Sequence, residues 1–166
     1  MPLTTKKLAV ALAVAAAAIT LVPLGADAAT STSATSTASW TTPVGLWKGT
    51  VEFGEGTGNV RFVFLPGGRV CLNSSPTDGS GGGGQGTGRW HATGAHTFTY
   101  QIREREFDAS GTTTGFVDVD QNATQSGNTF TSSGMSDILD VNGNLITTVE
   151  SHVNVSRKIT PTPPLC

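Results

Sequence analysis

Between positions 96 and 107 the sequence is His96-Thr-Phe-Thr-Tyr-Gln-Ile-Arg-Glu-Arg-Glu-Phe107. Apolar and polar residues alternate here, with Phe98, Tyr100 and Ile102 on one face and Thr, Gln and Arg on the other. A period of two is typical of a β-strand, because successive side chains point to opposite sides of the sheet. The segment therefore predicts a strand that buries one of its faces.

Seven further runs of this kind follow one another along the chain. Their bounds are 45–53, 59–65, 69–73, 87–92, 112–123, 129–139 and 145–158. Most links between them are short and contain Gly, Asn or Asp, which adopt the backbone conformations of tight turns. Eight consecutive strands predict an all-β fold, an eight-stranded antiparallel up-and-down barrel. A two-sheet sandwich is the alternative, and barrel closure is favoured because it removes exposed sheet edges.

One link is much longer than the others. The segment 73–88 contains seven glycines after position 78, four of them consecutive at 81–84. Such a composition predicts a flexible loop of about 14 residues, either a lid over a barrel mouth or a mobile surface insertion. It has neither the Lys-Ser/Thr ending of a P-loop nor a helix after it, so a phosphate-binding loop is not expected.

The first 28 residues have the parts of a cleavable secretory signal. Lys6 and Lys7 precede an apolar stretch, and Ala26-Asp27-Ala28 fits the cleavage site. The apolar stretch, about 15 residues, is shorter than the ~20 residues that a membrane-spanning helix needs. We therefore expect a secreted protein, cleaved near Ala28, without a membrane span.

The rest of the chain divides into three parts. They are a Ser/Thr-rich leader at 29–42, the β-barrel domain at 43–159 and a Pro-rich tail at 160–166. The leader cannot bury enough apolar surface to fold, so we expect it to be disordered. An exported chain meets oxidants, and its two cysteines, Cys71 and Cys166, are an even number. We expect them to form a disulfide; two unpaired thiols and a bridge to another molecule are the alternatives.

Charge and motif content exclude several function classes. Charged residues make up 13% of the chain, about half the usual ~25%, and the net charge is −2. Nucleic-acid binding is excluded, since it needs a face rich in Lys and Arg. The three histidines are scattered, and no common catalytic or metal-binding motif occurs. We therefore expect no metal and no cofactor, and nothing in the pattern indicates an oligomeric state.

A family resemblance comes from motifs at the two ends of the predicted barrel. Gly45-Leu-Trp47 opens the first strand, and Arg157 lies in the last. This resembles the calycin superfamily, in which the Trp of a Gly-x-Trp motif is covered by an Arg or Lys. The order of motifs is also similar to that of small exported bacterial barrels of the lipocalin-like and allene-oxide-cyclase-like kind. The matching motifs begin at Gly45, Phe64, Gly88, Phe107 and Asp140. The resemblance implies that Trp47 plugs the closed end and that Arg157 stacks on it.

An eight-stranded barrel is just wide enough to be filled by side chains or to hold one small ligand. The residues expected to bind such a ligand are Phe62, Phe64, Phe98, Tyr100, Thr147, Val149 and Ser151. An apolar lining with a few hydroxyl groups is typical of a small-molecule pocket. The first functional hypothesis is therefore a secreted, lipocalin-like barrel that binds a small hydrophobic molecule.

Two other functions remain open. Glu104 and Glu106 continue the apolar face of the 96–107 strand, and a desolvated carboxyl group can serve as a general acid or base. With Tyr100 as hydrogen-bond donor, they would suit a cofactor-free cyclase or isomerase that acts on a hydrophobic polyene or polyketide. Alternatively, the strand emerges into solvent by residue 104, or a bulge turns the two carboxylates to the other face. The sequence Arg103-Glu-Arg-Glu106 would then be a solvated ladder of cross-strand pairs. The third hypothesis is an envelope or inhibitor protein that acts through its outer face, which a filled interior would favour.

Overall fold

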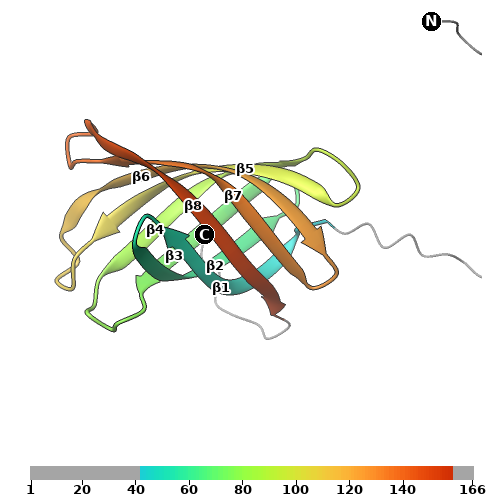
Figure 1. The fold of residues 1–166 in the computed structure, drawn as a ribbon, viewed down its shortest axis with the longest axis horizontal. Helices are drawn as coiled ribbons and strands as arrows, with labels where there is room; N and C mark the ends of the chain where they lie inside the picture. Colours follow the sequence, from blue (N-terminus) through green and yellow to red (C-terminus); the bar gives the residue numbers. More distant parts are fainter. Residues whose placement is uncertain (1–41, 159–166) are drawn as a thin grey trace, which may run out of the picture. The chain divides into compact units, whose positions relative to one another are not determined.

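The computed structural model describes residues 42–158, which form one closed antiparallel barrel (Figure 1). The strands are β1 (Gly45–Phe53), β2 (Gly56–Leu65), β3 (Arg69–Pro76), β4 (Gly83–Ala92), β5 (Thr97–Phe107), β6 (Thr113–Ser126), β7 (Thr129–Leu139) and β8 (Leu145–Lys158). Each strand pairs with the next, and β8 pairs with β1, which closes the sheet. The predicted eight-stranded up-and-down barrel is confirmed, and the sandwich alternative is wrong.

Several predictions concern residues outside this described part. They are the secretory signal at 1–28, the leader up to residue 41, the tail at 160–166 and Cys166. Cys71 is fully buried in β3, and its bridge to Cys166 stays a prediction. Among residues 42–158 no helix is long and apolar enough to cross a membrane.

The largest difference from the predicted strands is at the glycine-rich link. The structure continues β3 to Pro76 and begins β4 at Gly83, so only residues 77–82 connect them. Glycine is depleted in strands, which is why the sequence pattern predicts a loop here. Pairing on both sides overrides this preference, since Gly84 lies opposite Ser74 of β3 and Glu106 of β5.

One half of the barrel interior is filled by aromatic rings. Six rings contact one another with centroids 5.0–6.5 Å apart, mostly edge to face: Trp47, Phe62, Phe64, Phe98, Tyr100 and Phe130. All six are 2% exposed or less. Edge-to-face contacts add to the stabilisation that burial of each ring provides. This cluster is the main hydrophobic core of the barrel.

Trp47 and Arg157 together cover the filled end. The Trp47 ring is completely buried, and its indole nitrogen donates to the Pro43 carbonyl at 2.6 Å. The Arg157 guanidinium lies 4.3 Å from the ring centroid and donates hydrogen bonds to the carbonyls of Val44 and Thr42. A cation over an indole face is an attractive arrangement, and these bonds hold it in place. The structure thus brings together the two residues that the resemblance implied.

The opposite end carries the longer hairpin loops, and Figure 1 shows the β3–β4 and β7–β8 loops at its left. The β5–β6 and β7–β8 loops repeat one turn, beginning at Asp108 and Asp140 respectively. In each turn one carboxylate oxygen accepts from the backbone amides two and four residues later. The Ser110 hydroxyl and the Asn144 side-chain amide also donate to these carboxylates. Together with the backbone amides they favour the ionised aspartates and hold the pKa values of Asp108 and Asp140 below the usual range. They stiffen the hairpins around this end without any regular secondary structure.

Candidate ligand-binding site

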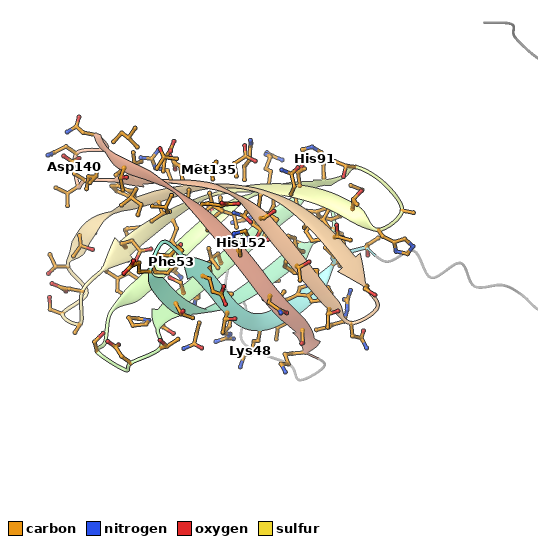
Figure 2. All side chains as sticks on the ribbon, viewed as in Figure 1. Lys48, Phe53, His91, Met135, Asp140 and His152 are labelled. Carbon is orange, nitrogen blue, oxygen red and sulfur yellow. The ribbon has the colours of Figure 1, made fainter. Side chains whose placement is uncertain are left out.

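The half of the barrel beyond the aromatic cluster is hollow. It holds a cavity of about 470 Å³ that all eight strands line, β4 through Gly83. The cavity reaches Phe53, Pro76 and Phe107 at the ends of their strands. Figure 2 labels Phe53 and Asp140 in the same half of the barrel. The volume lies in the range of pockets that hold one small molecule.

The structure sorts the seven predicted ligand-binding residues into two groups. Phe62, Tyr100, Val149 and Ser151 line the cavity. Phe64 and Phe98 do not, because they are packed within the aromatic half, and Thr147 is exposed near the start of β8. The alternation of a strand predicts which face a residue occupies, but not its level along the barrel axis.

Strand β5 carries two carboxylates into the cavity. Glu104 is 5% exposed, and Glu106 is half-buried one position further along the same face. Both lie over Gly84 of the neighbouring strand, where a Cβ atom would overlap the Oε1 atoms of both carboxylates. The alternative that the strand emerges into solvent by residue 104 is therefore wrong. The glycine of β4 provides the space in which the two carboxylates lie side by side.

The two carboxylates titrate abnormally. Burial raises the pKa of Glu104 from 4.5 to about 7, repulsion from Glu106 adds to the rise, and a hydrogen bond with the Ser74 side chain opposes it. Burial also raises the pKa of Glu106. The Oε1 atom of Glu104 is buried and has no hydrogen-bond partner among residues 42–158. Glu104 is therefore able to take up and release a proton near neutral pH.

The predicted hydrogen-bond donor, Tyr100, is held by a neighbour. Its side chain is 1% exposed, and its hydroxyl shares a 2.7 Å hydrogen bond with the Ser132 hydroxyl. Burial raises the pKa of Tyr100 above its ordinary value, so the phenol stays neutral. Tyr100 lines the cavity, but its hydroxyl is already engaged with a protein partner.

A second polar group comes from β6, β7 and β8, and Gln121 is its main member. The Gln121 side-chain nitrogen donates to Ser151 Oγ at 2.8 Å and to the Ser151 carbonyl at 3.4 Å. Ser151 Oγ also shares a 2.9 Å bond with Ser136 Oγ. The Gln121 carbonyl oxygen is buried without a hydrogen-bond partner in the described chain. Gln121 is not among the residues predicted from the sequence, although its alternation with Val117, Val119 and Ala123 could have identified it.

No basic side chain is among the cavity-lining residues. Arg103 points to the outer wall, where it forms an ion pair with Asp118 at 3.2 Å, and Arg105 donates to the Thr113 hydroxyl at 3.0 Å. His91 contacts the Thr99 hydroxyl at 2.9 Å on the exposed surface. Within residues 42–158 no three His, Cys, Asp or Glu side chains are grouped to hold a metal ion. The electrostatics of the cavity are therefore set by the two glutamates.

Comparison with known proteins adds no relative. No family model matches the chain, and neither a curated protein nor a solved structure matches it. Membership of the calycin superfamily stays a prediction. The closed, eight-stranded antiparallel barrel is what the structure has in common with the calycin architecture.

Proposed function

We propose that the barrel binds one small, largely apolar molecule in its hollow half. The observation that carries this proposal is the 470 Å³ cavity, whose lining is mostly apolar with a few polar groups. Such a composition suits a ligand that is held by burial and oriented by hydrogen bonds. A barrel filled by side chains would have favoured action through the outer face. The predicted secretory signal at 1–28 supports a role outside the cell.

The proposal can be tested by narrowing the cavity mouth. Val149 lines the cavity from β8, whereas the next residue, Glu150, is exposed on the outer wall. The probe is the neutral dye N-phenyl-1-naphthylamine, which fluoresces in apolar surroundings. We expect saturable binding to the wild type and at least about ten-fold weaker binding to Val149→Trp, because the indole fills space that the ligand needs.

The matched control for this experiment is Glu150→Trp, which adds the same side chain to the outside of the barrel. It is expected to bind the dye as the wild type does. Urea unfolding of both variants identifies any loss of fold. Equal dye affinity in folded Val149→Trp and wild type would refute binding in the cavity.

Glu104 favours a second candidate function, acid–base isomerisation or cyclisation of a bound molecule. A buried carboxyl with a pKa of about 7 and an unpaired oxygen at the cavity wall is suited to proton transfer near neutral pH. The apolar surroundings would orient the substrate, and Glu104 would remove or supply the proton. No cofactor is needed for such a reaction.

Kemp elimination of a nitrobenzisoxazole tests this base directly. In that reaction a base removes the ring C–H proton, the N–O bond breaks, and a coloured cyanophenolate forms. We expect a rate above that of buffer that rises as the pH passes about 7, where Glu104 ionises. Glu104→Gln should abolish the increase, while Glu150→Gln should retain it. A wild-type rate equal to that of buffer would argue against a catalytic base in this cavity.

A further inference from the structure

We propose that the ligand of the cavity carries a protonated amine, which binds Glu104 and Glu106 while its apolar part fills the remaining space. This inference rests on the proposed binding function and names the chemical class of its ligand. Three features of the cavity carry it: the sign of its charges, the type of its unpaired polar atoms, and the neighbours of its carboxylates.

The charged groups that line the cavity are of one sign. Glu104 and Glu106 are its acidic residues, and none of the lining residues is Lys, Arg or His. The strands on either side add no positive charge, since β4 places Gly84 and Gly86 there, and β6 places Val117 there. The two arginines of β5 point outward, as described above. The described protein therefore supplies no cation that would neutralise the carboxylates from inside.

The unpaired polar atoms of the cavity are both hydrogen-bond acceptors. They are Glu104 Oε1 and Gln121 Oε1, each buried and without a partner in the described chain. The Ser151 carbonyl can only accept a hydrogen bond, so it orients the Gln121 amide with its nitrogen toward the carbonyl. The amide oxygen of Gln121 then points away and has no donor. An unpaired buried acceptor is costly, and a ligand that donates hydrogen bonds removes that cost.

An ammonium group matches the negative charge of the acidic pair and the unpaired acceptor beside it, Glu104 Oε1. It carries a positive charge and three donors with no acceptor, whereas an alcohol has one donor and lone pairs that would face the carboxylates. An anionic ligand would be repelled by Glu104 and Glu106 once they are ionised. The apolar lining from residues such as Val51, Val119 and Val149 then accounts for the rest of the molecule. The ligand class is thus a hydrophobic amine.

The proposal is tested with three probes that have an eight-carbon hydrocarbon chain and different head groups: n-octylammonium, 1-octanol and octanoate. Their affinities are measured directly at pH 8 by isothermal titration calorimetry. We expect n-octylammonium to bind at least about ten-fold more tightly than 1-octanol, because charge-assisted hydrogen bonds are stronger than neutral ones. Octanoate should bind most weakly, because the ionised glutamates repel it. In the double variant Glu104→Gln/Glu106→Gln, the preference for n-octylammonium over 1-octanol should fall to about two-fold or less. The control Glu150→Gln should retain the wild-type preference.

A pH series on the wild type needs no variant and remains informative if the double variant does not fold. Acidification from pH 8 to pH 5 protonates Glu104, so it should weaken n-octylammonium binding and should not weaken octanoate binding. If the dye binds but 1-octanol or octanoate matches n-octylammonium, the amine proposal is overturned and the binding function stands. If neither the dye nor any octyl probe binds, both proposals are overturned.

Discussion

Replacement of Trp47 by alanine is expected to lower the free energy of unfolding by about 3–5 kcal/mol. The indole is completely buried and packs edge to face against Phe130 at 5.0 Å. Its removal leaves a cavity and takes away the surface on which the Arg157 guanidinium rests. Because small domains are stable by only about 5–15 kcal/mol, a loss of this size removes a large share of the total stability.

Urea unfolding followed by circular dichroism measures this loss. Trp90→Ala is the matched control, because Trp90 is only half-buried and lies at the edge of the same cluster. We expect the control to lose clearly less stability than Trp47→Ala. An equal loss in the two variants, or a loss below about 1 kcal/mol for Trp47→Ala, would contradict the role of Trp47 as the plug of the filled end.

The second large effect is a fall in stability as the pH rises from 5 to 8. The pKa of Glu104 is about 7 in the folded protein, against an ordinary value of 4.5 for the unfolded chain. Between these values the folded state binds more protons than the unfolded state. The contribution of Glu104 is therefore complete below pH 4.5 and is lost as the pH rises through 7. Its full size is on the order of 3 kcal/mol.

Glu104→Gln isolates this contribution, because glutamine has nearly the same shape and stays neutral. Urea unfolding of wild type and variant at several pH values should show curves that diverge from pH 5 to pH 8, with the variant more stable at the upper end. The aspartates of the loop turns, Asp108 and Asp140, have pKa values below the ordinary aspartate range, which itself lies outside this window. Parallel curves for the two proteins would refute a buried, ionising Glu104.

Much of the barrel could be predicted from the sequence because strand alternation is a local property. The 96–107 segment alone indicates which side chains share a face, and the structure places Ile102 and Glu104 on the inward one, as that pattern requires. The order of strands follows from the short links, since hairpins join neighbours. Closure then follows from the need to pair the outermost strands, β1 and β8.

The missed features depend on residues far apart in the sequence. The level of a side chain along the barrel axis depends on how the strands are staggered, so Phe62 reaches the cavity and Phe64 does not. The glycine-rich segment of β4 is a strand because β3 and β5 pair with it on both sides. The bond between Gln121 and Ser151 joins residues 30 positions apart, and no spacing rule predicts it.

The separation of the barrel into an aromatic half and a hollow half bears on how such a protein can change. Substitutions at distant positions usually have independent effects on stability. Residues such as Ser136 and Val149 line the cavity, and neither belongs to the buried core cluster that contains the six rings. Selection can therefore alter the lining of the hollow half while the aromatic half preserves the fold.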